Sequence, residues 1–192
     1  MGTGTKEGGA VVLVPVKAFA QAKRRLSGVL SPQERRVLAK RLAERVLKAA
    51  HPLPVAVVCD DAEVARWAES MGATVIREPG SGLNGAVAAA YAHLSDQGYE
   101  RVIISHSDLP LARTFSWLAA HPGIVLVPDR RLDGTNVVSL PAGLDFQFSY
   151  GPGSFARHKQ EAQRSGLTWK VVHDQALGWD VDIPADMAVA AL

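Results

Sequence analysis

Short apolar runs alternate with longer amphipathic stretches along most of the chain. Apolar runs bounded by turn residues predict buried strands, and apolar positions three and four residues apart predict helices. The pattern predicts strands at 10–16, 55–59, 74–76, 101–105, 124–127 and 136–140, and helices at 32–50, 61–71, 84–97, 111–120 and 154–165. Strands that alternate with helices favour a mostly parallel sheet covered on both faces, so we expect a three-layer α/β domain.

Two kinds of end signal support these helices. Ser31 stands directly before 32–50, with Glu34 in the first turn, which is the pattern of an N-cap. Gly72 and Gly98 follow two other predicted helices, where glycine commonly ends a helix.

The central apolar run leads to one carboxylate, Asp108, and is stopped by Pro110. In open α/β sheets ligands bind beyond the carboxyl ends of the strands, so Asp108 is our first candidate metal ligand. Near the other end of the sequence, Asp180 and Asp182 flank Val181, and alternation along an extended segment places both carboxylates on one face. We therefore expect three carboxylates to converge.

Composition narrows the class of protein. The 192 residues are enough for one domain, 47% of them are hydrophobic, and the formal net charge is only +2. These values argue against a disordered chain and against nucleic-acid binding through bulk charge. The one cysteine, Cys59, lies in an apolar run and is expected to be packed, which favours a reducing cytoplasm.

Residues 1–9 are expected to form a frayed leader, and 10–192 a single domain, because no linker or repeat interrupts them. No run approaches the roughly 18 apolar residues of a membrane span, so we expect no membrane partner.

The segment after the first strand is rich in cations, with Lys17, Lys23, Arg24 and Arg25 close together. In a nucleotide-binding α/β domain this loop lies over the triphosphate, whose charge lysine and arginine neutralise. A solvated basic loop is the alternative interpretation.

Seven motifs together resemble one known family. They are Pro-Val-Lys at 15–17, Ala-Lys-Arg-Arg-Leu at 22–26, Gly-Leu-Asn at 82–84, Asp-Leu-Pro at 108–110, Val-Pro-Asp-Arg at 127–130 with Gly-Thr-Asn at 134–136, Gly-Pro-Gly-Ser-Phe at 151–155 with His158, and Asp-Val-Asp-Ile-Pro at 180–184. In this order they resemble the phosphoenolpyruvate or 2-phospho-L-lactate guanylyltransferases of coenzyme F-420 biosynthesis. The resemblance implies a Rossmann-like nucleotidyltransferase fold of the glycosyltransferase-A type.

The resemblance also implies roles for single residues. Asp108, Asp180 and Asp182 would hold Mg²⁺; the alternatives are a helix cap before Leu111 for Asp108 and a solvated strand end for the other two. Lys17 and Lys23 would act on the phosphates beside Asp108.

On the acid side, Thr135, Gly151 and Ser154 would contact the substrate, with Arg130 or Arg131 a weaker addition. The alternative for 151–153 is a simple helix-entry turn.

The nucleotide side would comprise Lys17, Lys23 and Arg25 together with Gly82 and Asn84. Asn84 would lie near the base, or it could cap its own helix.

A substrate phosphate with a second pKa of about 6 needs no protein base to attack GTP. We therefore expect His106 and His158 to pack or cap rather than to transfer protons. What remains is to bring two polyanions together, which requires Mg²⁺ and fixed cations.

The preferred reading is transfer of GMP from GTP to phosphoenolpyruvate, with 2-phospho-L-lactate second and 3-phosphoglycerate third. A downstream transferase would consume the product, and a homodimer stays open. A cytidylyl- or molybdopterin-type transferase and a non-catalytic module that binds a phosphorylated metabolite are the alternatives.

Overall fold

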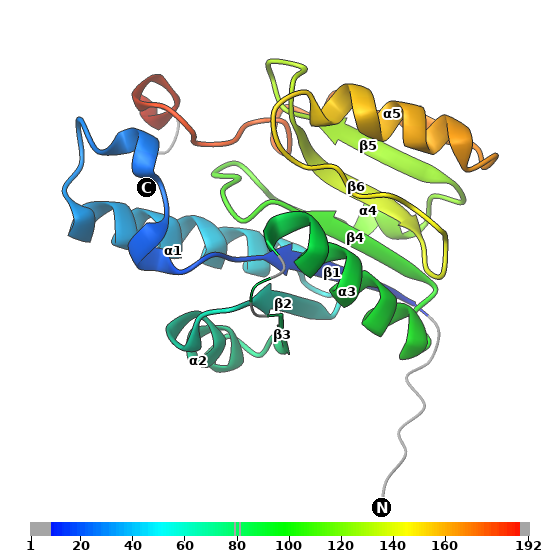
Figure 1. Cartoon of the computed structure of the whole chain (residues 1–192), viewed down its shortest axis with the longest axis horizontal. Helices are drawn as coiled ribbons and strands as arrows, with labels where there is room; N and C mark the ends of the chain where they lie inside the picture. Colours follow the sequence, from blue (N-terminus) through cyan, green and yellow to red (C-terminus); the bar gives the residue numbers. More distant parts are fainter. Residues whose placement is uncertain (1–8, 79, 81, 189–192) are drawn as a thin grey trace, which may run out of the picture.

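The computed structural model describes residues 9–78, 80 and 82–188 (Figure 1). The strands are β1 Ala10–Pro15, β2 Val55–Cys59, β3 Thr74–Arg77, β4 Arg101–Ser105, β5 Ile124–Pro128, β6 Thr135–Pro141 and β7 Trp169–Val171. The helices are α1 Pro32–Ala50, α2 Ala62–Ser70, α3 Gly82–Asp96, α4 Ser116–Ala119 and α5 Ser154–Arg164, with short 3-10 turns η1 Phe19–Gln21, η2 Arg24–Leu26 and η3 Pro184–Ala188.

All seven strands form one sheet in the order β3-β2-β1-β4-β6-β5-β7. β1, β2, β3 and β4 are mutually parallel, β6 is antiparallel to both β4 and β5, and β7 is parallel to β5. β6 therefore runs against the other six strands. The prediction of a mostly parallel mixed sheet is confirmed, and six strands end at the same edge.

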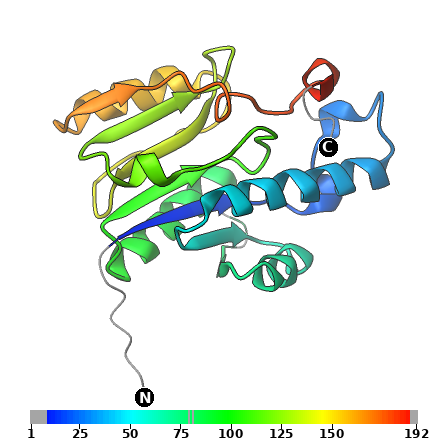
Figure 2. The same ribbon diagram turned by 180° about the vertical axis from the view of Figure 1, so that it is seen from behind.

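Helices cover both faces of the sheet, as the three-layer prediction requires (Figures 1 and 2). On one face α1, α2 and α4 bury one set of alternating strand side chains, such as Val12 and Val57. On the other face α3 and α5 bury the opposite set, such as Leu13 and Val58. This alternation follows from the two-residue period of a strand.

Side-chain hydrogen bonds cap the starts of two helices. The Ser31 hydroxyl accepts the Glu34 N–H while the Glu34 carboxylate accepts the Ser31 N–H, which completes a capping box at the start of α1. Asp61 caps α2 by accepting the N–H groups of Glu63 and Val64.

One predicted helix is largely wrong. Residues 111–120 contain only the short α4, because Leu109, Ala112 and Phe115 are buried one by one from an irregular segment. These three residues are spaced three positions apart, which is also the spacing of apolar residues on one face of a helix. No helix starts after Asp108 in this part of the described chain, so the alternative of Asp108 as a helix cap is also wrong.

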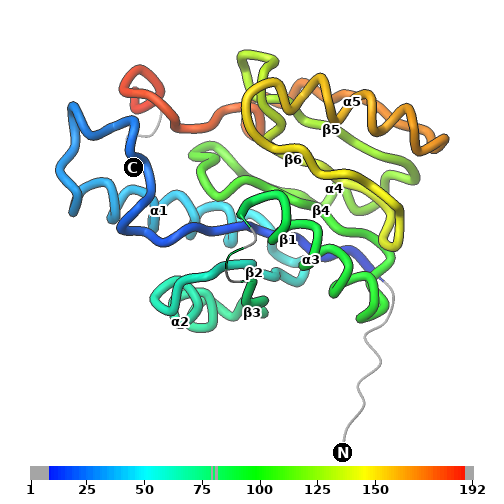
Figure 3. Tube along the Cα trace, viewed as in Figure 1, coloured from blue at the N-terminus to red at the C-terminus, as the bar shows by residue number. Residues whose placement is uncertain are grey.

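The segment with Asp180 and Asp182 lies outside the sheet. Figure 3 shows it passing from the β5 side of the molecule to the loop after β1, where Val181 is fully buried against Leu26 and Leu42. Of the predicted leader and domain, residues 1–8 and 189–192 lie outside the described residues. In the described part of the chain, no helix combines the length and the apolarity that crossing a membrane requires.

Candidate active site at the carboxyl edge of the sheet

A cavity of about 470 Å³ opens where the parallel strands end. Its walls come from the loop after β1, the residues after β4, the turn between β5 and β6, the start of α5 and the C-terminal segment. The charged and histidine residues of the lining are Lys17, Lys23, Arg24, Arg25, His106, Asp108, Asp129, Asp133, Asp180 and Asp182. Cations thus come from one side and carboxylates from the other.

The structure brings together the three carboxylates singled out from the sequence, since Asp108, Asp180 and Asp182 all line this cavity. The Val181 N–H donates to the main-chain carbonyl of Asp108 at 3.2 Å, which fastens the C-terminal segment beside the end of β4. Because Val181 is turned into the core, its two acidic neighbours face the cavity.

Two of these carboxylates carry an unsatisfied oxygen. Oδ1 of Asp108 and Oδ1 of Asp180 are buried and accept no hydrogen bond from the described residues. Burial, followed by the negative charges of Asp108 and Asp182, raises the pKa of Asp180 to about 6. Burial also acts to raise the pKa of Asp108, but the charge and hydrogen bond of Lys23 outweigh it and the net direction is down.

Lysine and arginine from the loop after β1 already pair with two of the carboxylates. Nζ of Lys23 lies 2.5 Å from Oδ2 of Asp108 and 2.6 Å from the carbonyl oxygen of Val181, and its side chain is only 9% exposed. Lys23 adopts a left-handed backbone conformation with φ of 55°, which is uncommon for a residue with a side chain. Arg25 pairs with Asp182 at 2.9 Å on the surface.

The carboxylates of this cavity are candidate ligands for a divalent metal. Among the residues whose positions are described, no three His, Cys, Asp or Glu side chains are grouped closely enough to hold a metal ion by themselves. The unpartnered oxygens of Asp108 and Asp180 nevertheless supply hard ligands in one cavity. Mg²⁺ accepts such an incomplete set, because it keeps waters and completes its shell with substrate phosphates.

On the acid side, Gly134, Gly151 and Ser154 line the cavity, whereas Thr135 does not appear among the lining residues. Gly151 has φ of 119°, a conformation that favours glycine. A Cβ on Gly134 would lie 2.9 Å from Oδ2 of Asp129, so a side chain there would force the Asp129 carboxylate to shift. Glycine is therefore favoured at 151 by its backbone conformation and at 134 by the close approach of Asp129.

Thr135 and Arg130 lie behind the wall. Thr135 is fully buried and its hydroxyl lies 3.0 Å from Nδ1 of His158. Arg130 bonds to Asp186 and lies over the ring of Trp179, 4.4 Å from its centroid.

The start of α5 is occupied by a residue that sequence reasoning missed. The carboxylate of Asp133 accepts the Gly153 N–H at 3.1 Å, and its main-chain carbonyl accepts the Phe155 N–H at 2.9 Å. A helix N-terminus favours such an anion. Asp129 was also missed: it accepts the N–H groups of Arg131, Asp133 and Gly134 and so shapes the β5–β6 turn.

The side-chain amide of Asn84 bonds to the main chain of Tyr150 in both directions. Its nitrogen donates to the Tyr150 carbonyl at 3.3 Å, and its oxygen accepts the Tyr150 N–H at 2.7 Å. Gly82 begins α3 with φ of 64°. Of residues 82–84, Leu83 lines the cavity, whereas Gly82 and Asn84 do not. Asn84 thus connects α3 to the loop before α5. Among the described residues, the Asn84 side chain makes no capping hydrogen bond to the main chain of α3.

The two histidines differ. His158 is fully buried, accepts the Ser149 N–H at Nε2, and burial lowers its pKa to about 4, so it is packed and neutral as expected. His106 lines the cavity, with Nδ1 4.0 Å from Oδ1 of Asp108. Burial is also the main cause that lowers the pKa of His106.

Comparison with known proteins gives consistent results. The family described as "Guanylyl transferase CofC like" matches residues 10–191. A phosphoenolpyruvate guanylyltransferase of Sphaerobacter thermophilus is 35% identical over 92% of this chain and 90% of its own length. A 2-phospho-L-lactate guanylyltransferase of Methanothermobacter thermautotrophicus is 35% identical over 91% of this chain and 81% of its own length. The solved structure of a nucleotidyl transferase from Methanothermobacter shares the fold, with a TM-score of 0.64 and 14% identity over 95% of each chain.

Proposed function

The chain belongs to the family of CofC-like guanylyl transferases, and from this premise we propose that it transfers GMP from GTP to phosphoenolpyruvate. The products would be enolpyruvoyl-2-diphospho-5'-guanosine and pyrophosphate, made for coenzyme F-420 biosynthesis. The observation that carries the proposal is the meeting of Asp108, Asp180 and Asp182 with Lys17, Lys23 and Arg25 around one cavity. Such a site suits two polyanions that must approach each other.

The reaction needs no protein base. An oxygen of the acid's phosphate forms a bond to the α-phosphorus of GTP, and the bond from that phosphorus to the oxygen bridging to the β-phosphate breaks. The electron pair leaves with pyrophosphate. Because the attacking phosphate is mostly dianionic above its second pKa of about 6, no proton has to be removed first. The burial of His158, whose Nε2 accepts the Ser149 N–H, is consistent with this chemistry.

The basic loop after β1 would bind the triphosphate. Lys17 and Arg24 line the cavity, and Lys23 and Arg25 reach across it to Asp108 and Asp182. The charged groups of Lys23 and Arg25 can exchange these carboxylates for phosphate oxygens, because both partners are anionic oxygens. Fixed cations aimed at a phosphoryl group stabilise the charge that develops during transfer.

Asp108, Asp180 and Asp182 would hold Mg²⁺. The bound cation would neutralise phosphate charge and draw both substrates to one point. The protein's own contribution is to keep three carboxylates at one edge, two of them with an oxygen that the described residues leave unpartnered. The acid would bind on the other wall, near Gly151 and Ser154.

The acid preference and the cellular setting belong to the proposal as well. One relative is named for phosphoenolpyruvate and another for 2-phospho-L-lactate, so 2-phospho-L-lactate is the second candidate. We place the enzyme in the cytoplasm, where GTP and phosphoenolpyruvate are made, and expect a downstream transferase to consume its product.

A screen of substrate pairs tests the function. Pyrophosphate release is followed for each of the four ribonucleoside triphosphates with phosphoenolpyruvate, 2-phospho-L-lactate and 3-phosphoglycerate, with Mg²⁺ and with the consuming transferase added. GTP with phosphoenolpyruvate should give the highest rate, and Asp108→Asn should abolish it. Preference for CTP would favour a cytidylyltransferase, and no release with any pair would favour a binding module.

A further inference from the structure

The candidate metal ligands Asp180 and Asp182 lie between β7 and η3, on a segment that belongs to no strand or helix of the described chain. The hydrogen-bond ladder of the sheet therefore does not fix their carboxylates. Between them, Val181 is held by its buried side chain and by its N–H, which donates to the carbonyl of Asp108. The direction in which the two carboxylates leave the chain depends on the contacts of the residues on either side.

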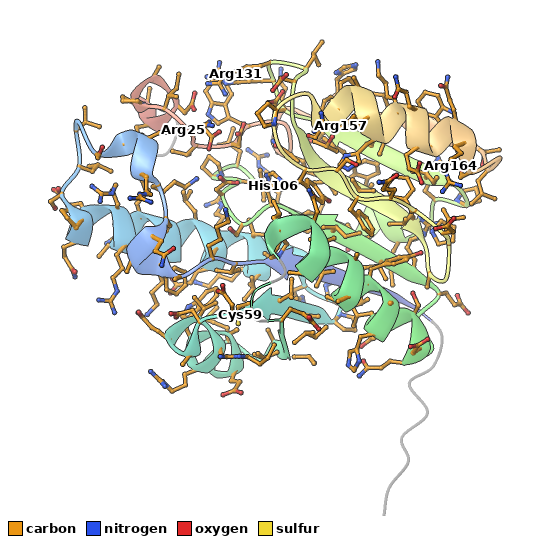
Figure 4. The ribbon with its side chains drawn as sticks, viewed as in Figure 1. Arg25, Cys59, His106, Arg131, Arg157 and Arg164 are labelled. Carbon is orange, nitrogen blue, oxygen red and sulfur yellow. The ribbon has the colours of Figure 1, made fainter. Side chains whose placement is uncertain are left out.

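On the C-terminal side these contacts converge on Asp186. Its carboxylate is fully buried, and Oδ2 accepts the main-chain N–H groups of Asp182 at 2.8 Å and Ile183 at 2.9 Å. The other oxygen, Oδ1, accepts hydrogen bonds from the guanidinium groups of Arg130 and Arg131, the latter at 2.7 Å. Figure 4 shows Arg131 at the top of the view, between η3 and α5. We call this carboxylate with its bonds to the four residues the Asp186 anchor.

On the N-terminal side the same segment is held by Arg130. Its guanidinium lies over the ring of Trp179, which directly precedes Asp180, at 4.4 Å from the ring centroid. Its main-chain N–H donates to the carbonyl of Gly178 at 2.8 Å. The tripeptide 180–182 is therefore tied at both ends to the turn between β5 and β6.

A cap of the short helix η3 would by itself explain only half of the Asp186 anchor. Asp61 shows such a local cap at the start of α2, where one oxygen accepts two nearby N–H groups. Asp186 does the same with Oδ2, but its Oδ1 binds two guanidinium groups from 55 and 56 positions earlier in the chain. Bonds between charged partners hold a carboxylate in one orientation more firmly than neutral ones. One of the N–H groups that it fixes in this way belongs to a candidate metal ligand, Asp182.

We propose that Asp186 is a positioning residue that sets the place of the Asp180 and Asp182 carboxylates in the metal site. The inference rests on the proposed function and extends it from the ligands to the group that aligns them. Groups that orient metal ligands typically contribute roughly 10- to 100-fold to metal affinity. Because Asp186 acts through the main chain, its loss should weaken metal binding more than it slows transfer once metal is bound.

The two halves of the anchor can be removed together or separately. Asp186→Ala removes both, Asp186→Asn keeps an oxygen for the N–H groups but gives up the charge, and Arg131→Met removes one guanidinium. We expect the affinity for Mn²⁺, measured by calorimetric titration without GTP, to fall at least about tenfold in Asp186→Ala. Asp186→Asn and Arg131→Met should show smaller losses of the same sign.

Asp61→Ala is the matched control, because it also removes a carboxylate that accepts two main-chain N–H groups but does not line the cavity. It should lower the melting temperature and leave the Mn²⁺ affinity unchanged. Hydrogen exchange gives a readout that needs neither metal nor activity. The N–H groups of Asp182 and Ile183 should lose protection in Asp186→Ala and keep it in Asp61→Ala.

Steady-state rates separate positioning from general damage to the fold. In Asp186→Ala the Mg²⁺ concentration that gives half the maximal rate should rise about tenfold, whereas the rate at saturating Mg²⁺ should recover most of its wild-type value. A rate that stays low at every Mg²⁺ concentration, with unchanged Mn²⁺ affinity, would reduce Asp186 to a structural cap and overturn the inference. If Asp186→Ala does not fold, an unchanged Mn²⁺ affinity in Arg131→Met overturns it in the same way.

Two further results distinguish this inference from the function on which it rests. If Asp180→Asn and Asp182→Asn both bind Mn²⁺ as tightly as the wild type, the metal site is misplaced and the inference falls with it. If the wild type binds Mn²⁺ through these carboxylates and Asp186→Ala weakens that binding, but no substrate pair releases pyrophosphate, the proposed function falls and the positioning role of Asp186 stands.

Discussion

The ammonium nitrogen of Lys23 lies 2.5 Å from a carboxylate oxygen of Asp108, although 85 positions separate the two residues in the sequence. The same nitrogen donates to the carbonyl of Val181, so one lysine joins the loop after β1, the end of β4 and the C-terminal segment. In this arrangement Lys23 binds Oδ2 of Asp108 and leaves Oδ1 without a partner among the described residues. The ammonium charge would repel a cation at Oδ1, so lysine and metal would compete for the charge of Asp108.

Replacing Lys23 by methionine should strengthen the binding of free metal. Without the ammonium group, the charge of Asp108 is available to the cation, so the affinity for Mn²⁺ in the absence of GTP should rise at least about tenfold. The affinity for GTP should fall, because a phosphate-binding cation is lost. Calorimetric titration measures both. Lys40→Met, at an exposed position of α1, should leave both affinities unchanged. Weaker metal binding by Lys23→Met would contradict the competition.

Asp180→Asn should make the metal-free protein more stable at neutral pH and abolish pyrophosphate release. The pKa of Asp180 is raised to about 6, so its contribution to stability is full below the unfolded pKa and is lost as pH rises through 6. Asparagine does not ionise, so the variant avoids that loss. Its free energy of unfolding at pH 7.5 should be higher than that of the wild type by about 1 to 3 kcal/mol after allowance for solvent screening. Urea unfolding in EDTA at pH 4.5 and 7.5 measures it. Asp182→Asn, at a more exposed carboxylate, should change stability little, and an equal gain there would argue against burial as the cause.

His158 should make the protein sensitive to acid. Its pKa is lowered to about 4, mainly by burial, so the folded state excludes a proton that the unfolded chain binds below pH 6.5. The stability from this group is complete above pH 6.5 and declines as pH falls toward 4, by roughly 3 kcal/mol in total. The difference in unfolding free energy between wild type and His158→Gln, measured from pH 4.5 to 7.5, should therefore shrink in acid. A constant difference would show that the histidine does not titrate in this range.

Asn84→Ala should affect the acid more than the nucleotide. The substitution leaves the N–H and the carbonyl of Tyr150 without their partner, which costs about 1 to 3 kcal/mol of stability. Because Tyr150 precedes Gly151 in the acid wall, KM for phosphoenolpyruvate should rise severalfold while KM for GTP stays nearly constant. Asn84→Asp, which keeps the acceptor for the Tyr150 N–H, should be intermediate. A selective rise in KM for GTP would instead support a role of Asn84 near the base.

The predictions that succeeded depend on local signals. The apolar runs at 101–105 and 124–127 are strands whose side chains are buried on both faces of the sheet. Ser31 and Glu34 mark the start of α1 through hydrogen bonds between residues only three positions apart. Asp108 could be placed at the ligand edge because it follows a strand, whereas Asp180 and Asp182 were grouped with it through their alternation around Val181 and through the family resemblance.

What could not be predicted depends on contacts that exist only in the folded chain. Asp129 and Asp133 act through main-chain N–H groups of a turn and of a helix start, and neither pattern has a signature in residue types alone. Arg130 was expected at the substrate from the family resemblance, as a weaker addition, but the buried carboxylate of Asp186, 56 residues later, binds it. The direction of β6 was likewise beyond reach, since an apolar run does not specify its neighbour's orientation.

The reversed direction of β6 matters for anyone who wishes to change the acceptor. Because this strand begins, rather than ends, at the ligand edge, the short connection between β5 and β6 reaches the cavity through Asp133 and Gly134. It is separate from the basic loop after β1, which we propose binds the triphosphate. A library randomised at 131–133, with Asp129 and Gly134 retained to preserve the turn, would vary acceptor scope while leaving the nucleotide half of the enzyme in its present form.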